Sequence, residues 1–334
     1  MRLLWKIKYP LFGVVGLVLL RNAFKGFATP FRIRAAMNLF LISITVASIY
    51  GVIKAWGEFN LLTFATGAFE DRNGGLTGVM RYSYGIQMVL IVLSGLLVYR
   101  KQVPDFFNRG LFFTAYATSL IGLWASGSRG AFVGFLCAFP FIFFFANRWR
   151  FWISGVPCWT LAGLILFGNY TSNTGVRILN HQPSASSALR GMQGDDRLSL
   201  YQAALLALKE RPALGYGPGQ FRAQIIRLRE QYDLSWKGRS ASHAHNVFLE
   251  TAANLGSVGL VVLLGWLYFW ARELWARKDL MAKCILPFIC AFIVSGQFEY
   301  TFDANNAFLI FFIYSISSIA SPTEPKLATH HAGR

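Results

Sequence analysis

A succession of continuous apolar stretches is the feature that most restricts how this chain can fold. The stretches are apolar throughout and do not alternate with polar residues as half-buried strands do. A membrane-spanning helix needs roughly 20 apolar residues, so flanking polar residues would have to complete the shorter stretches. The clear stretches are Ala35–Ile53, Tyr82–Tyr99, Leu111–Ser126, Ala131–Ala146, Phe151–Phe167, Leu255–Trp270, Cys284–Gly296 and Ala307–Ala320, and Leu11–Leu20 is a weaker ninth candidate.

Composition excludes a soluble globule. Apolar residues make up 54% of the 334 residues, charged residues only 14%, and the mean hydropathy is +0.43. Soluble proteins are usually about a quarter charged and could not bury so much apolar surface. We therefore predict an all-α polytopic membrane protein of about eight or nine transmembrane helices. The four cysteines all lie in apolar stretches, which is typical of small packing residues.

The charges of the short loops predict which helix ends face the cytoplasm. Arg21–Arg34 is basic without any acid, whereas Gln297–Asn306 contains only two acids. The positive-inside bias then gives one consistent alternation along the chain. It places Arg21–Arg34, Arg100–Gly110, Asn147–Arg150, Ala271–Lys283 and the C-terminus in the cytoplasm, and Lys54–Arg81, Gly127–Gly130, Gly168–His245 and Gln297–Asn306 outside.

Four regions follow from this topology. They are N-terminal transmembrane helices (1–167), an extracytoplasmic loop (168–244), C-terminal transmembrane helices (245–320) and a cytoplasmic tail (321–334). The alternation would put the basic N-terminus outside. Either Leu11–Leu20 does not span the membrane, or upstream helices are missing from this chain.

The long outer loop is basic, with ten basic and five acidic residues between Gly168 and Ala244. A solvated domain of mixed charge would explain this, and so would an anion site, because Arg suits phosphate. Within it, Asp195–Leu208 has an apolar face and acidic caps, which predicts a short helix. Pro212 and the glycines of Gly215–Gly219 predict a turn, and Gln220–Leu228 a second short helix.

Two arginines at predicted outer helix ends are candidates for anion binding. Arg129 lies in Ser126-Gly-Ser-Arg-Gly-Ala131 between two apolar stretches, where it must snorkel or find an anion. Arg197 lies in the first turn of its predicted helix, where free N–H groups favour an anion. The alternatives are an interfacial hairpin arginine, and an ion pair of Arg197 with Asp195 or Asp196.

Two histidines precede the apolar stretch Leu255–Trp270. His243 and His245 lie in Ser242-His-Ala-His-Asn-Val-Phe-Leu-Glu250. A histidine has a pKa near neutrality, which suits a catalytic base. The alternatives are interfacial capping histidines, and a zinc site completed by His181, Asp195 or Glu250, although no ligand spacing supports zinc. If the segment were helical, the two side chains would point about 200° apart.

The order of these motifs resembles the O-antigen ligase superfamily, which also contains O-antigen polymerases and protein O-oligosaccharyltransferases. The resemblance covers about Leu111–Ile319, although this chain has fewer predicted spans than full-length ligases. It is carried by Ser128-Arg-Gly-Ala131, Asp195-Asp-Arg197, Arg211-Pro-Ala-Leu-Gly-Tyr-Gly-Pro-Gly-Gln-Phe221, His245-Asn-Val-Phe-Leu-Glu250 and Leu255-Gly-Ser-Val-Gly259.

The resemblance implies a GT-C-like, metal-independent inverting glycosyltransferase of the bacterial inner membrane, with no cofactor and an active site facing the periplasm. Its donor would be a glycan on undecaprenyl diphosphate, and its acceptor a hydroxyl of lipid A–core, of a growing glycan or of a protein. The implied catalytic residues are Arg129, Arg197 and His245, with Arg190, Arg211, Arg222, His243, Asn246 and Gly217 as further candidates for binding diphosphate or glycan.

Two functions from other classes compete with this interpretation. A solute or anion transporter would place ionisable residues at midplane depth, yet the main polar groups of the predicted spans are Asn38, Gln87 and Ser94. A structural scaffold of an export complex would tolerate alanine at Arg129 and His245. The position of the charges at the outer face favours the enzyme.

Overall fold

The computed structural model describes residues 30–56, 59–60, 65–66, 79–102, 108–167, 196–234, 243–277, 279–302, 306, 309–311 and 313–314. The candidate span Leu11–Leu20 lies outside the described residues. So do Arg190, His181 and Asp195.

The described chain is helical apart from one two-stranded ribbon, in which β1 (Phe59–Asn60) pairs antiparallel with β2 (Ala65–Thr66). The helices are α2 (Pro30–Trp56), α3 (Val79–Val98), α4 (Arg109–Ala125), α5 (Arg129–Ala138), the 3-10 helix η1 (Phe139–Phe143), α6 (Arg148–Phe167), α8 (Asp196–Glu210), α9 (Phe221–Gln231), α10 (Val247–Arg277) and α11 (Leu280–Ser295).

Seven of the predicted apolar stretches coincide with these helices, and two of them differ in an informative way. The stretch Ala131–Ala146 divides into α5 and η1 because Pro140 has no N–H for an α-helical bond and begins the tighter 3-10 turn. The stretch beginning at Leu255 is preceded by two more helical turns from Val247. A break at Gly256 (φ 67°, ψ −165°) separates those turns from the long part of α10.

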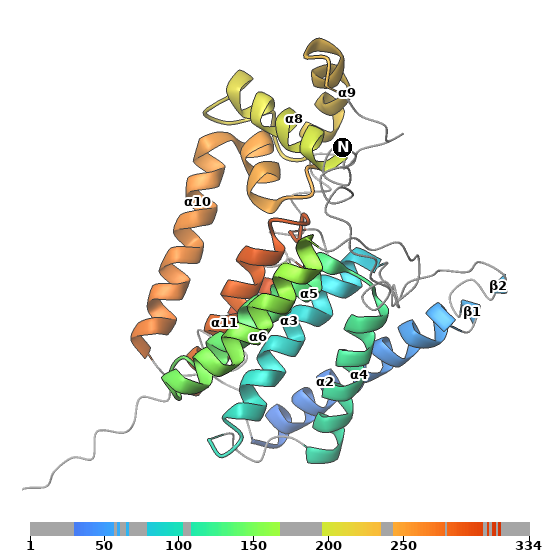
Figure 1. Cartoon of the computed structure of the whole chain (residues 1–334), viewed down its shortest axis with the longest axis vertical. Coiled ribbons are helices and arrows are strands. Elements are labelled where there is room, and N and C mark those ends of the chain that lie inside the picture. The colour runs from blue at the N-terminus through green and yellow to red at the C-terminus, as the bar shows by residue number, and fades with distance from the viewer. Residues whose placement is uncertain are drawn as a thin grey trace, which may run out of the picture.

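The helices form a bundle with two distinct ends (Figure 1). The C-terminal end of α3 and the N-terminal ends of α4, α6 and α11 lie at one end, while α8 and α9 cover the opposite end. At the first end, the ammonium of Lys283 donates to Gln102 (3.3 Å) and lies over the ring of Tyr99. The grouping follows the alternation that the loop charges predict. We call the end covered by α8 and α9 the outer end.

Small residues bring α3, α5 and α11 unusually close together. A Cβ on Gly95 of α3 would lie 2.9 Å from the Cα of Cys284 in α11. A Cβ on Gly130 of α5 would lie 2.2 Å from the hydroxyl oxygen of Tyr84, and one on Gly134 would lie 2.6 Å from Nε2 of Gln87. In a bilayer, such close approach lets van der Waals contact hold helices together.

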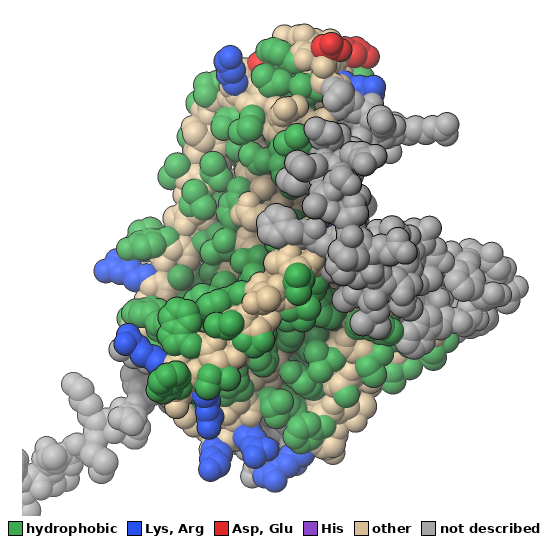
Figure 2. Space-filling view, viewed as in Figure 1, with side chains coloured by type: hydrophobic (Ala, Val, Ile, Leu, Met, Phe, Trp, Pro, Cys, Tyr) green, Lys and Arg blue, Asp and Glu red, His purple; other side chains and the backbone are tan. Residues whose placement is uncertain are grey.

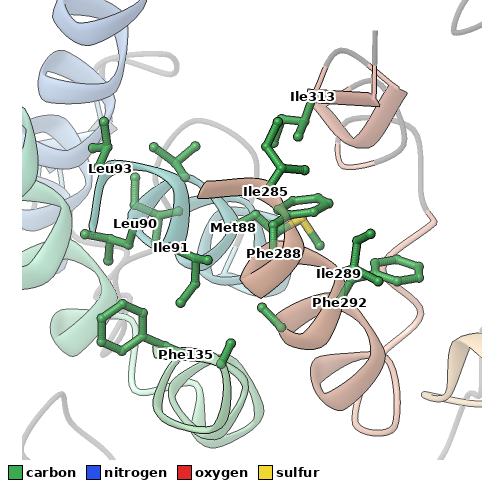
Figure 3. Close-up of a cluster of buried hydrophobic side chains, with 14 of the residues drawn as sticks. Met88, Leu90, Ile91, Leu93, Phe135, Ile285, Phe288, Ile289, Phe292 and Ile313 are labelled. Carbon is green, nitrogen blue, oxygen red and sulfur yellow. The ribbon is translucent and has the colours of Figure 1, made fainter. Parts of the chain in front are cut away.

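The core lies where these three helices meet, and Figure 3 shows its side chains converging. Met88, Leu90 and Ile91 of α3 and Phe288 of α11 are fully buried in one cluster, in which Met88 lies beside Phe288. Branched and aromatic side chains fill this region densely, which sums many weak dispersion contacts. The outer end of the bundle, where the site lies, therefore rests on a rigid frame.

The outside of the bundle is apolar, as Figure 2 shows, with Lys and Arg side chains gathered toward the end opposite α8 and α9. Leu39, Ile153 and Val261 are 65%, 69% and 67% exposed. Within the described residues, α10 is the one helix that is long and apolar enough by itself to cross a bilayer, and four shorter apolar helices accompany it. Such an extensive exposed apolar surface is typical of a protein embedded in lipid.

The pair α8 and α9 has a small core of its own, built on Ala203, Phe221 and Ile225, all fully buried. It is joined to α10 at the break. The backbone N–H of Ser257 donates to the Pro212 carbonyl (2.7 Å). The pair α8 and α9, which forms the outer layer, is thus fixed to α10, the long apolar helix that follows the two histidines.

Candidate active site at the outer end of the bundle

Arg129 and Arg197 begin two different helices at the outer end. Arg129 is the first residue of α5, and its side chain is exposed. Arg197 is the second residue of α8 and is half-buried. The first turn of a helix presents backbone N–H groups without helical partners, so both positions favour an anion.

The buried hydroxyl of Tyr84 is a common neighbour of the two helix starts. It hydrogen-bonds with Ser128, which directly precedes Arg129, and it lies within electrostatic range of Arg197, Glu299 and Tyr201. The outer ends of α3, α5, α8 and the turn after α11 therefore surround one point. Neither Tyr84 nor Tyr201 was a sequence candidate.

The turn that carries the histidines is held by hydrogen bonds at both sides. The backbone N–H of Ala244 donates to the buried carboxylate of Glu250 (2.7 Å), and that of Val247 donates to the Gly296 carbonyl (2.7 Å). His245 itself adopts a left-handed backbone conformation (φ 49°), which non-glycine residues rarely do. The conformation persists because the surrounding bonds impose it, and such strain tends to occur at functional sites.

His245 lies against a buried carboxylate. Its Nδ1 atom is 3.1 and 3.0 Å from the two carboxylate oxygens of Glu299, whose side chain is only 6% exposed. Burial alone would raise the pKa of the Glu299 carboxyl. The hydrogen bond from His245, the charges of His245 and His243, and the backbone N–H of Tyr300 together outweigh burial and lower that pKa below its ordinary value of 4.5. Glu299 is therefore an ionised carboxylate at neutral pH.

The rings of His243 and His245 lie on the same side of the chain. Their centroids are 4.1 Å apart, and Nδ1 of His243 is 3.4 Å from Glu299. A helix would have separated them by about 200°, but residues 243–246 precede α10 and are not helical. The structure thus makes a pair of the two histidines, with about a quarter of each side chain exposed.

The sequence of this region also matches a known family. Residues 114–264 match the family model described as O-antigen ligase. The chain carries an O-antigen ligase domain. The match confirms the resemblance seen in the motifs, and it spans Arg129, Arg197, His243 and His245. A comparison with curated proteins finds no match.

The O-antigen ligase domain implies a helical, polytopic membrane protein that performs glycan transfer of the ligase or polymerase type on lipid-linked glycans. The exposed apolar surface of the bundle agrees with this. Glu299 and Tyr84 lie outside the matched residues, so this chain completes the site with residues on either side of the O-antigen ligase domain.

Three side chains, those of His243, His245 and Glu299, lie close enough together to be tested as ligands of a metal ion. Their ligand atoms all lie within 4.8 Å of one another, and two histidines with one carboxylate suit zinc. However, the backbone N–H of His245 already donates to Nδ1 of His243 (3.2 Å), and Nδ1 of His245 is at hydrogen-bond distance from Glu299. These contacts engage the Nδ1 atoms of both rings in a hydrogen-bonded cluster, so a metal would have to bind the rings through their Nε2 atoms.

Asn246 is engaged in structure. Its side-chain oxygen accepts the N–H groups of Phe248 and Leu249, and its NH₂ group donates to Gln297 (3.1 Å). It therefore caps the start of α10, as Asn does at many helix starts. A role in substrate binding stays a prediction that these contacts do not support.

Of the remaining sequence candidates that the structure describes, Arg211 lies away from the start of α8. Arg211 follows the last turn of α8, which puts it on the order of 20 Å from Arg197 along the helix axis. It is exposed and its guanidinium lies over the ring of Tyr216 (5.6 Å). Gly217 (φ 99°) forms the following turn, and Arg222 is exposed on α9. Binding of diphosphate or glycan stays a prediction for these residues.

Proposed function

We propose that this protein is an O-antigen ligase-type glycosyltransferase. It moves a glycan from undecaprenyl diphosphate to a hydroxyl acceptor, lipid A–core above all, at the outer leaflet of the bacterial inner membrane. The observation that carries the proposal is the paired His245 and buried Glu299, held at the same end of the bundle as the starts of α5 and α8.

The two arginines would bind and neutralise the diphosphate. A lipid diphosphate leaves readily once its growing negative charge is stabilised, and arginine does this through paired hydrogen bonds. Both arginines stand in first helical turns, whose N–H groups and dipole add to the positive potential. This supports a metal-independent reaction.

His245 would act as the general base. The acceptor oxygen forms a bond to the anomeric carbon as the bond from that carbon to the diphosphate oxygen breaks. The hydroxyl proton passes to Nε2 of His245, and the diphosphate leaves with the bonding electrons. Attack opposite the leaving group inverts the anomeric centre. A positioned base typically contributes on the order of 10²–10⁴ in rate.

The position of His245 suits a lipid-borne donor. It lies just before α10, whose long part runs along the side of the bundle toward the opposite end (Figure 1). The break at Gly256 separates the first part of the helix from the long apolar part, which supports a position of the histidines at the membrane surface. A diphosphate on a membrane lipid and a hydroxyl acceptor from the periplasm could meet there.

Two alternatives use different chemistry or a different acceptor. An O-antigen or exopolysaccharide polymerase would use the same site with a growing glycan as the acceptor, and a protein O-oligosaccharyltransferase would use Ser or Thr. A membrane transporter of solutes or anions is disfavoured, because the charged residues of the described helices stand near helix ends.

Transfer from a purified polyprenyl-diphosphate-linked glycan, measured with EDTA present, tests the proposal. Arg197→Ala should remove most activity, Arg197→Lys should restore only part because the bidentate contact is lost, and His245→Ala should cost about 10²–10⁴-fold. Arg150→Ala, at the opposite end of the bundle, is the matched control and should keep full activity.

Two results would contradict the proposal. Full activity in both Arg197 variants would remove the diphosphate role. If EDTA abolished transfer and zinc restored it, the reaction would need a metal, and His245 would be a ligand and not a base.

A further inference from the structure

The two histidines present the same nitrogen to different partners. Nδ1 of His245 faces the carboxylate of Glu299 at 3.0 Å. Nδ1 of His243 lies 3.2 Å from the backbone nitrogen of His245 and, in a longer contact, 3.4 Å from Glu299. The shorter contact of His245 is to a group that only accepts a hydrogen bond, and the shorter contact of His243 is to a group that only donates one, so the two rings are not equivalent.

These partners determine where each neutral ring carries its proton. An ionised carboxylate has no hydrogen to donate, so Nδ1 of His245 must carry the proton and Nε2 keeps its lone pair. Nδ1 of His243 accepts the backbone N–H in the shorter of its two contacts, which uses its lone pair and puts the proton on Nε2. The contacts therefore select opposite tautomers in rings whose centroids are 4.1 Å apart.

We propose that Glu299 is the positioning residue that makes Nε2 of His245 the base, and that His243 is held in the opposite tautomer as an Nε2–H donor beside it. The inference rests on the proposed function for the role of the base. Glu299 lies outside residues 114–264, which match the O-antigen ligase family, and 54 residues after His245.

The pairing explains how the proton would be held during transfer. When the acceptor hydroxyl gives its proton to Nε2, His245 becomes an imidazolium, and the buried negative charge of Glu299 stabilises it. The lowered pKa of Glu299 keeps that carboxylate ionised, so it does not take the proton itself. His243 places a donor where an oxygen of either substrate can accept it.

The strained backbone of His245 serves this arrangement. A left-handed residue at this point turns its N–H onto His243 and its ring onto Glu299. Conformations of this kind cost about 1–3 kcal/mol and persist only where neighbouring contacts impose them. The other titratable groups around Glu299 are Tyr84 from α3, with Arg197 and Tyr201 from α8 within electrostatic range of that hydroxyl.

Kinetics separate positioning from a purely structural role. Glu299→Gln keeps the shape but removes the charge and can invert the tautomer, so we expect transfer to fall on the order of 10²–10⁴-fold, as in other His–carboxylate pairs. The acid limb of the pH profile of kcat/KM should also move to lower pH, because the imidazolium loses its negative partner. Glu299→Asp keeps the charge and should recover part of the rate. Glu230→Gln, on the exposed face of α9, is the matched control.

The tautomers can be read without any transfer assay. In full-length protein labelled with ¹⁵N-histidine, nitrogen shifts at pH 8 distinguish Nδ1–H from Nε2–H rings. The chain has five histidines, and His243→Gln and His245→Gln assign the two signals. We expect Nδ1–H for His245, Nε2–H for His243, and a shift of His245 toward Nε2–H in Glu299→Gln.

The outcomes are distinct. Two rings in the same tautomer, or a Glu299→Gln variant with unchanged rate and unchanged pH profile, would overturn the inference. If the wild-type protein transfers no glycan, the proposed function fails, and the nitrogen spectra still decide whether Glu299 selects the tautomer of His245.

Discussion

The glycine at the break of α10 offers the most direct test of how the outer layer is held. Gly256 combines φ 67° with ψ −165°, a region that only glycine occupies readily. A Cβ built there would lie 2.2 Å from the carbonyl oxygen of Ala213 and 2.6 Å from the backbone nitrogen of Leu214. Both are main-chain atoms, so no side-chain rotation can relieve the contact.

The cost of Gly256→Ala can be worked from these contacts. The conformation itself is unfavourable for alanine by about 1–3 kcal/mol. Ordinary contact begins near 3.4 Å, so the loop must move away by more than an ångström, which breaks the bonds from Ser257 to Pro212 (2.7 Å) and from Val258 to Ala213 (3.2 Å). Each such bond contributes roughly 0.5–1.5 kcal/mol, giving a total loss of roughly 2–6 kcal/mol.

Thermal unfolding of the detergent-solubilised protein, followed by the loss of its monodisperse peak in size-exclusion chromatography, measures this loss of stability. We expect the midpoint for Gly256→Ala to fall on the order of 10 °C. Gly265→Ala is the matched control on the same helix, because no atom lies within 4 Å of its added Cβ. Alanine there should be neutral or stabilising by up to about 1 kcal/mol. Equal midpoints for the two variants would refute the reasoning.

Two further predictions concern orientation and pH. A cysteine at Ala223, exposed on α9, should react with an impermeant maleimide in intact spheroplasts, whereas one at Ala146, exposed at the opposite end, should react only after lysis; the reverse pattern would place the site in the wrong leaflet. Because the pKa of Glu299 lies below 4.5, its ionised form stabilises the fold above that pH, and this contribution is lost as the pH falls further. The stability difference between wild type and Glu299→Gln should therefore shrink as the pH falls below 4.5, and a difference that grows below pH 4.5 would show that the carboxyl is not ionised at neutral pH.

Sequence alone determined the positions of the helices and the elements that carry the site. Hydropathy is a local property, so the stretch Phe151–Phe167 predicts α6 to within a few residues of its observed start at Arg148. Arg129 and His245 stand out because they lie near the starts of apolar stretches, and Arg197 because it lies in the first turn of a predicted amphipathic helix, and the family match covers all three.

Tertiary structure decided which residues complete the site. Glu299 appears in the sequence only as one of two acids in a short outer loop, and no local pattern links it to a histidine 54 residues earlier. Tyr84 reads as an ordinary apolar residue of α3, yet the close approach allowed by Gly130 places its hydroxyl beside Ser128. Helix packing sets both contacts, and packing depends on the shapes of surfaces distant in the chain.

The relative position of the two histidine rings also depends on tertiary structure and not on local sequence. A helical period predicts rings on opposite sides, and that expectation fails because the backbone at His245 turns into the left-handed region. The turn is imposed by a bond from Ala244 to Glu250 in the first part of α10 and by a bond from Val247 to Gly296 at the end of α11. Sequence supplied the two imidazoles, and only the folded chain decided that they share one carboxylate.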